Sequence, residues 1–333
     1  MNYPLSDEGK STPPPALTVI IPALNESASI ESTVKRLQQT LAPIPHEIIV
    51  VDDGSTDGTG NIAIKAGAKL IRHPQPGGYG NALKSGICAS SHELIAIVDA
   101  DGTYPVERFL DLYGVVAYDG VHMAVGDRQG DHYYGGHVKK IARYIFTFLT
   151  EFSAGRKIPD VNSGMRVFRK KDVMDFYETL CSGFSFTTTI TLAYLFKSYY
   201  IRYIPIDYFE REGKSKVNHF KDSLRSLQII VQSILYYNPL KIYVCLLGLL
   251  SLSFLVCALF VFANAAASLL AFVFLAFFWG ILGMGFLGVI CSNLGSILKE
   301  QRRTKHEYSH FVETMSVGDS FCAVPGPAKP EMS

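Results

Sequence analysis

Short apolar runs alternate with segments of helical periodicity from about residue 17 to residue 216. Apolar runs of strand length occupy 17–23, 47–55, 68–73 and 93–100. Between them, apolar residues at helical spacing, together with capping residues, predict helices at 25–41, 55–67 and 79–90. This alternation predicts an α/β fold with a mostly parallel sheet and helices on both of its faces.

Further along, the apolar residues become continuous. No Asp, Glu, Lys, Arg or His occurs from Ile242 to Ser292. Because about 20 apolar residues cross a bilayer as a helix, this run is long enough for two spans. We expect a transmembrane hairpin over 241–292, with helices at about 241–263 and 268–292. The alternative is a buried hairpin of a soluble protein, but soluble helices rarely go so far without a charge.

Basic residues flank the apolar run on both sides, with Lys241 before it and Lys299, Arg302 and Arg303 after it. The positive-inside rule therefore predicts a two-span protein with both flanks and both termini in the cytoplasm. We expect a disordered tail at 1–15 without a signal peptide, and a cytoplasmic tail at 293–333. The glycines of the second span, Gly280, Gly283, Gly285 and Gly288, either pack two subunits into a homo-oligomer or are ordinary membrane-helix glycines.

Residues 217–240 have an apolar face, which includes Leu224, Leu227 and Ile234, and charges elsewhere. This pattern predicts interfacial helices that lie on membrane lipid, or else a core helix that links domains.

Composition narrows the classes of function. The chain has 333 residues, is 48% hydrophobic and carries a formal net charge of +1, which gives no reason to expect nucleic acid as a partner. Its 6 cysteines are scattered and contain no CxxC pair. We expect them to be reduced thiols in a domain that faces the cytoplasm.

Polar side chains gather where three of the predicted strands end. These are Asn25 with Glu26, Asp52 with Asp53, and Asp99 with Asp101. Ligands on parallel sheets bind at the carboxyl ends of the strands, so we expect these clusters to converge. Helix N-capping is the alternative, but a cap needs one carboxylate and a second one nearby repels it. Two acids one residue apart suit Mg²⁺, which fills its other positions with water and substrate phosphate.

Seven motifs occur in the order seen in family 2 glycosyltransferases. They are "VIIPALNE", "VVDDGSTDGT", "GGYGNALKSG", "DADGTYP", "GDR", "NSGMRVFRK" and "YFEREGKSKVN". The chain resembles the branch of dolichol-phosphate mannose synthase and the bacterial polyprenyl-phosphate glucosyltransferases. The resemblance covers roughly residues 17–300. It implies a Rossmann-like GT-A catalytic domain at 16–216.

The resemblance also implies roles for individual residues. Those matched to the nucleotide-sugar site are Pro22, Ala23, Glu26, Asp52, Asp53, Asp99, Ala100 and Asp101. Asp53 matches the acid that contacts the base, and Asp99 and Asp101 match the pair that binds Mg²⁺ or Mn²⁺. Thr103 stands where mannose synthases commonly have Gln, so the third metal ligand is Thr103 or water. The glycine-rich turn before residue 79 matches one beside the nucleotide, where a helix N-terminus favours phosphate.

On the acceptor side, the resemblance implies a polyprenyl phosphate held by cations. The matching positions are Arg128, Arg143, Thr147, Arg211, Ser215 and Lys216. A guanidinium grips phosphate with two hydrogen bonds, although these residues are alternatively surface charges or contacts to anionic lipid. We name Asp101, Arg128 and Arg211 as the candidate catalytic residues.

The implied activity is that of an inverting glycosyltransferase. It moves a hexose from a nucleoside diphosphate sugar, of the GDP-mannose or UDP-glucose type, to a polyprenyl or dolichyl phosphate at the cytoplasmic membrane face. One rival is a processive polysaccharide synthase, but those carry a QxxRW motif and the only tryptophan here is Trp279. The other rival is a non-catalytic membrane scaffold of the same fold.

Overall fold

The computed structural model forms two compact units, residues 1–230 with 322–333, and residues 231–321. It describes residues 13–130, 147–148, 150–152, 154–183 and 185–209 of the first unit. Of the second unit it describes 247–249, 251–256, 258–259, 273, 276–281, 283–284, 287–288, 291 and 295. The predicted interfacial helices at 217–240, the turn of the predicted hairpin and most of the tail at 293–333 lie outside the described residues.

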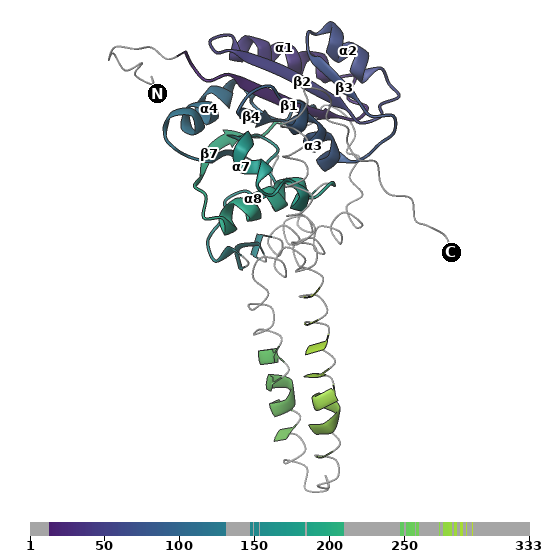
Figure 1. Cartoon of the computed structure of the whole chain (residues 1–333), viewed down its shortest axis with the longest axis vertical. Coiled ribbons are helices and arrows are strands. Elements are labelled where there is room, and N and C mark those ends of the chain that lie inside the picture. Colours follow the sequence, from purple (N-terminus) through teal and green to yellow (C-terminus); the bar gives the residue numbers. More distant parts are fainter. Residues whose placement is uncertain are drawn as a thin grey trace, which may run out of the picture. The chain divides into compact units, whose positions relative to one another are not determined.

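A seven-stranded sheet forms the centre of the first unit, in the order β3-β2-β1-β4-β6-β5-β7 (Figure 1). Its strands are β1 (Leu17–Ala23), β2 (His46–Asp52), β3 (Lys69–Arg72), β4 (Leu94–Ile97), β5 (Met123–Gln129), β6 (Arg166–Arg169) and β7 (Ile201–Asp207). Strands β1 to β4 pair in parallel, and β7 runs parallel to β5. Only β6 runs antiparallel to both of its neighbours, so the prediction of a mostly parallel sheet is confirmed.

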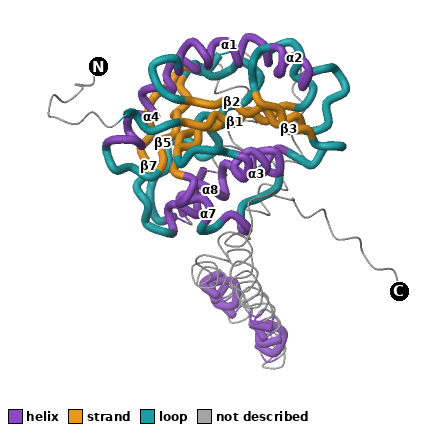
Figure 2. Tube along the Cα trace, turned by 45° about the horizontal axis from the view of Figure 1, so that its top comes forward, coloured by secondary structure: helices purple, strands orange, loops and turns teal. Residues whose placement is uncertain are grey.

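Helices cover both faces of the sheet (Figure 2). The helices are α1 (Ile30–Leu41), α2 (Thr59–Lys65), α3 (Tyr79–Ala89), α4 (Phe109–Tyr118), α7 (Lys170–Met174) and α8 (Phe186–Phe196), with 3-10 turns η1 (Val106–Arg108) and η2 (Tyr177–Thr179). Figure 2 shows α1 and α2 on one face and α3, α7 and α8 on the other. Helix α4 joins the core of the α1 face, which includes Val19 and Val50 from the sheet.

Burial on both faces explains why β1 and β2 are apolar almost throughout rather than alternating. All residues of β1 are buried, and so are all of β2 except His46. On the other face, α3 approaches β1 closely at Gly86, where an added Cβ would meet the side chain of Ile20. These contacts hold the carboxyl ends of β1, β2 and β4 at fixed positions, and the candidate site lies there.

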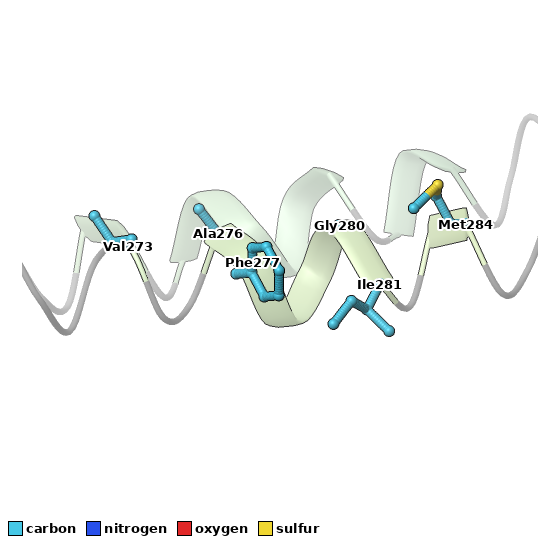
Figure 3. Close-up of a pocket in the computed structure, with 6 residues that line it drawn as sticks. All are labelled: Val273, Ala276, Phe277, Gly280, Ile281 and Met284. Carbon is cyan, nitrogen blue, oxygen red and sulfur yellow. The ribbon is translucent and has the colours of Figure 1, made fainter.

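In the described parts of the second unit, apolar side chains are largely exposed. Phe277, Met284 and Leu249 expose 70%, 73% and 62% of their surface. Figure 3 shows a shallow apolar pocket along the second predicted span, lined by Val273, Ala276, Phe277, Gly280, Ile281 and Met284. Among the described residues, no helix has the length and hydropathy needed to cross a membrane. The predicted transmembrane hairpin therefore stays a prediction.

Candidate functional site

Three neighbouring strands end together at one edge of the sheet. In the ladder, Ala23 of β1 pairs with Asp52 of β2, and the backbone N–H of Asp53 donates to the carbonyl of Ala23 at 2.8 Å. On the other side of β1, the N–H of Val98 donates to the carbonyl of Ile20, which places Asp99 beside the end of β1. The predicted convergence of the polar clusters on one edge is thus confirmed in the backbone.

The loop after β1 is tied to the loop after β2. The side-chain oxygen of Asn25 accepts a hydrogen bond from the backbone N–H of Thr56 at 2.8 Å. The N–H of Glu26 donates to the hydroxyl of Thr59 at 2.8 Å. Asn25 has a φ of 49°, in the left-handed region that Asn tolerates better than most residues. These bonds fix the loop that contains Glu26, one of the residues matched to the nucleotide-sugar site.

The two acids after β2 are both buried and both engaged by the protein. Asp52 is 2% exposed, accepts from the N–H of Ser55 at 2.9 Å and lies 3.4 Å from the guanidinium of Arg72. Asp53 is 4% exposed, and the N–H groups of Gly77 and Gly78 each donate to its carboxylate at 2.8 Å. Helix α2 begins at Thr59 after the N-cap residue Gly58, so neither acid caps it: Asp52 holds the turn at Ser55, and Asp53 binds a distant loop.

His73 completes the surroundings of Asp53. Its Nδ1 lies 2.7 Å from Oδ1 of Asp53, and its Nε2 lies 2.9 Å from the hydroxyl of Ser85. Because an ionised carboxylate only accepts hydrogen bonds, Nδ1 carries the proton. The glycine-rich turn, which we expected beside the nucleotide, is thus held by an internal carboxylate that accepts from the N–H groups of Gly77 and Gly78.

The acids after β4 lie in different surroundings. The hydroxyl of Tyr79 donates to Oδ1 of Asp99 at 2.8 Å. Asp99 also contacts the backbone of Gly164, where an added Cβ would lie 2.5 Å from Oδ2. Asp101 is 8% exposed and accepts from the N–H and the hydroxyl of Thr103, the latter at 2.7 Å. Thr103 therefore orients Asp101 with its hydroxyl.

Tyr104 lies near both Asp99 and Arg128. Its hydroxyl accepts a hydrogen bond from the N–H of Gly164 at 2.7 Å, and its ring meets that of Tyr208 edge to face at 5.4 Å. The guanidinium carbon of Arg128 lies 5.2 Å from the centre of the Tyr208 ring. Burial raises the pKa of Tyr104 well above its usual value, with Arg128 opposing the rise and Asp99 adding to it. The candidate metal acid and the candidate acceptor arginine thus both lie near one buried phenol.

Arg128 itself forms a two-point ion pair with Asp160. Nε lies 2.7 Å from Oδ2 and Nη2 lies 2.9 Å from Oδ1, and the two side chains are 13% and 1% exposed. Burial acts to raise the pKa of Asp160, but the charge and hydrogen bonds of Arg128 and the N–H of Asn162 outweigh it, so the pKa lies below its ordinary value. Arg128 is therefore held in one pose by a buried carboxylate.

The loop that carries Asp160 and Gly164 is held by Arg166, which is fully buried. Its guanidinium donates to the carbonyls of Ser163 at 2.8 Å and Val161 at 2.7 Å, and to the hydroxyl of Thr191 on α8 at 2.7 Å. Backbone carbonyls thus stabilise a buried cation, and the cation orders the loop. One loop consequently touches Asp99 through Gly164 and Arg128 through Asp160.

The remaining predicted positions are described only in part. Pro22 and Ala100 are buried beside the strand ends, and the carbonyl of Ala100 accepts from the hydroxyl of Thr33 at 3.4 Å. Thr147 is partly exposed in a short helical stretch. Arg143, Arg211, Ser215 and Lys216 lie outside the described residues, so their roles stay predictions.

Comparison with known proteins decides what kind of protein this is. A family model described as glycosyl transferase family 2 matches residues 18–176, from β1 through α7. A dolichyl-phosphate hexose transferase of Haloferax volcanii is 32% identical over 209 residues, which is 61% of this chain and 87% of the relative. The chain belongs to glycosyl transferase family 2. It is a glycosyltransferase, so the scaffold interpretation is not supported.

Other relatives of this glycosyltransferase differ in length and in what their names describe. The low-salt glycan biosynthesis hexosyltransferase Agl6 of Haloferax volcanii is 30% identical over 222 residues, 65% of this chain, and the chain spans only 53% of its length. Among solved structures, glucosyl-3-phosphoglycerate synthase of Mycobacterium tuberculosis in complex with Mn²⁺, UDP-glucose and phosphoglyceric acid superposes with a TM-score of 0.56 at 21% identity. That match covers 66% of this chain and 80% of the other, and it confirms the GT-A fold.

Several residues that organise the glycosyltransferase site were missed in the sequence. Tyr79, Tyr104, Asp160, Arg166 and Tyr208 contact the predicted acids and arginine directly or through one neighbour. All five fall inside or beside quoted motifs, and their place in those motifs was the available signal. Their partners lie far away in the sequence, so no local pattern indicates them.

The donor set at the end of β4 suits a hard divalent cation. Asp99 and Asp101 supply carboxylate oxygens one residue apart, and Mg²⁺ in proteins is usually bound by one or two carboxylates, with water and phosphate completing its shell. Within the described ranges, no cluster of three or more His, Cys, Asp or Glu side chains with metal-site geometry occurs. An all-protein cage is thus absent from the described part, and a site shared with substrate phosphate fits the residues.

Proposed function

We propose that this glycosyltransferase moves a hexosyl group from a nucleoside diphosphate sugar to a polyprenyl or dolichyl phosphate, with inversion at the anomeric carbon. The observation that carries the proposal is that Asp99 and Arg128 both lie near the buried phenol of Tyr104. Acids for a metal-bound diphosphate thereby lie near a cation for a second phosphate.

The donor side rests on the ends of β1, β2 and β4. Asp99 and Asp101 would hold Mg²⁺ or Mn²⁺, which when bound supplies Lewis-acid stabilisation of the departing diphosphate. Pro22, Ala23 and Glu26 line the strand end where the nucleoside is expected, and Ala100 lies between the two acids. The Mn²⁺ and UDP-glucose named with the glucosyl-3-phosphoglycerate synthase structure are compatible with this donor class.

The acceptor side rests on Arg128 and on the predicted partners outside the described residues. A phosphate monoester has its second pKa near about 6, so it is already an anionic nucleophile at neutral pH and needs little help from a base. Its oxygen attacks the anomeric carbon as the bond from that carbon to the diphosphate oxygen breaks. Arg128 orients the acceptor phosphate and screens its charge from that of the donor.

A lipid acceptor requires the site to lie near a membrane. The name of the Haloferax dolichyl-phosphate hexose transferase supports a lipid phosphate acceptor. The charge-free run from Ile242 to Ser292 and the exposed apolar side chains in its described parts support a membrane hairpin. We place the catalytic domain on the cytoplasmic side, following the basic flanks of that run.

A screen of donors and acceptors tests the proposal. The purified full chain is incubated with Mn²⁺ or Mg²⁺, with UDP-glucose or GDP-mannose, and with a polyprenyl phosphate or phosphoglyceric acid, and nucleoside diphosphate release is measured. We expect release from one donor that depends on polyprenyl phosphate. Release that depends only on phosphoglyceric acid, the acceptor named with the mycobacterial synthase, would replace the lipid acceptor by a soluble one.

A further inference from the structure

Asp53 fixes the turn at 74–78 to the end of β2. Both of its carboxylate oxygens take part, Oδ1 with the N–H of Gly77 and Oδ2 with the N–H of Gly78. Behind it, a Cβ on Gly54 would lie 2.8 Å from the backbone of Gln75, so turn and strand end are in close contact. Gly78 has a φ of 102°, a conformation that side-chain-bearing residues rarely adopt.

Tyr79 follows this turn directly and opens α3. Its hydroxyl reaches Oδ1 of Asp99 at 2.8 Å. The same carboxylate also lies against the backbone of Gly164, in the loop ordered by Arg166. Asp99 is therefore bounded by two loops, each held by a buried charged side chain.

We propose that Tyr79 is a positioning residue that orients the Asp99 carboxylate for a divalent cation, and that Asp53 acts on the same carboxylate by fixing the turn before Tyr79. The inference rests on the proposed function, in which Asp99 is a metal ligand. It gives Asp53 a role that differs from contacting the base of the nucleotide. With 4% of its surface exposed, Asp53 has three hydrogen-bond partners in the protein itself, His73, Gly77 and Gly78.

The hydroxyl of Tyr79 fixes the orientation of the Asp99 carboxylate. A carboxylate at a strand end rotates about its side-chain bonds, and a fixed donor on one oxygen selects one rotation. Hydrogen bonds to metal ligands of this kind typically change metal affinity or activity by about 10- to 100-fold when they are removed. The phenol is rigid and its backbone is anchored, so it serves this purpose better than a flexible donor.

Mn²⁺ binding to the full chain in the absence of donor tests the inference directly. The Tyr79→Phe variant removes only the hydroxyl, and free Mn²⁺ is measured by electron paramagnetic resonance during titration. We expect the dissociation constant to rise about 10-fold or more. Turnover of Tyr79→Phe should recover as Mn²⁺ is raised to saturation, which a general structural defect would not do.

Tyr177→Phe is the matched control. The hydroxyl of Tyr177 donates to the carbonyl of Lys84 at 3.1 Å, so this variant removes a phenol that binds the same helix without touching Asp99. It should keep the Mn²⁺ affinity of the wild type. An equal loss in both variants would overturn the inference, because loosening of α3 would then explain both.

The Asp53→Asn variant tests the proposed role of Asp53 in fixing the turn before Tyr79. The amide places a donor where the carboxylate accepts from Gly77 or Gly78, so the turn loses a hydrogen bond and Mn²⁺ binding without donor should weaken. Unchanged Mn²⁺ affinity with a higher KM for the donor would overturn this part and favour a base contact. Wild-type affinity in Tyr79→Phe would overturn the inference while leaving the proposed transfer intact. No Mn²⁺ binding by the wild type, either alone or with a nucleoside diphosphate present, would overturn both the inference and the metal role.

Discussion

The guanidinium of Arg128 and the carboxylate of Asp160 form a two-point ion pair at 2.7 and 2.9 Å, with Asp160 almost fully buried. The pair joins the end of β5 to the loop before β6. The arginine that we propose for the acceptor phosphate is thus also part of the internal structure. The proposed acceptor role and the structural role of Arg128 predict different effects of mutation.

Replacing Arg128 by Ala should reduce both acceptor use and stability. Leaving Asp160 buried and unpaired costs about 3–5 kcal/mol, so the midpoint of thermal unfolding should fall. Kinetics at varied donor and acceptor should show a larger rise in KM for the lipid acceptor than for the donor. Equal losses for donor and acceptor would contradict the assignment of Arg128 to the acceptor.

A double variant separates the two effects. Arg128→Met combined with Asp160→Leu removes both charges, and apolar replacement of buried pairs is often neutral for stability. We expect the unfolding midpoint to recover towards the wild-type value while acceptor use stays impaired. Recovery of acceptor use together with stability would show that Arg128 is only structural.

Asp101→Ala should abolish transfer and leave the protein folded. Asp101 accepts hydrogen bonds from the N–H and the hydroxyl of Thr103, two residues away in the same turn. Radiochemical transfer and circular dichroism measure the two effects. The control is Asp111→Ala, which removes an exposed acid paired with Arg108 three residues away. Near-normal transfer by Asp101→Ala would reject the metal role.

Gly164→Ala should lower turnover by displacing Asp99. The new methyl group would lie 2.5 Å from Oδ2 of Asp99, closer than such contacts allow, and the side chain is the part that can move. Because the clash displaces mainly the side chain of Asp99, we expect weaker activation of transfer by Mn²⁺ and a small change in the midpoint of thermal unfolding. An unchanged dependence of transfer on Mn²⁺ would mean that the loop containing residue 164 moves and that Asp99 keeps its position.

Glu47 predicts how stability depends on pH. Burial acts to raise its pKa, but hydrogen bonds from Lys69, Thr18 and Ser91 outweigh burial and lower the pKa to about 2. A carboxylate with a lowered pKa stabilises the fold fully above its unfolded-state value near 4.5, and that stabilisation is lost as the pH falls towards 2. The contribution is of the order of 3 kcal/mol.

Thermal unfolding of Glu47→Gln between pH 7 and pH 3 checks this. The variant should be less stable than the wild type at pH 7, and the difference should shrink as the pH falls. The site lies at the opposite end of the sheet, so the metal dependence of transfer should stay unchanged. A constant difference at every pH would contradict the lowered pKa.

The sequence predicted the sheet well where periodicity is strong. The run at 17–23 is β1 without change, and the predicted helix at 79–90 ends one residue early, at Ala89. The helix predicted at 25–41 begins later, at Ile30, because Asn25 and Glu26 belong to a loop tied to Thr56 and Thr59. The antiparallel β6 was not predicted, since its four residues carry no clear pattern.

The site was predictable only in part, for a physical reason. That the clusters meet follows from parallel strands, which bring their carboxyl ends to one edge. That Asp53 binds Gly77 and Gly78, or that Arg128 binds Asp160, depends on contacts across 24 to 32 positions of the chain. Such contacts are decided by loop paths and not by local periodicity.

The most direct test of the central claim is the appearance of sugar in the lipid product. The full chain receives nucleoside diphosphate [¹⁴C]hexose, Mn²⁺ and polyprenyl phosphate, and radioactivity is counted after extraction into organic solvent, with Asp101→Ala as the control. The account predicts a labelled hexosyl phosphoprenol from the wild type and only background from Asp101→Ala. Label that stays in the aqueous phase with every donor, or equal label with Asp101→Ala, would contradict it.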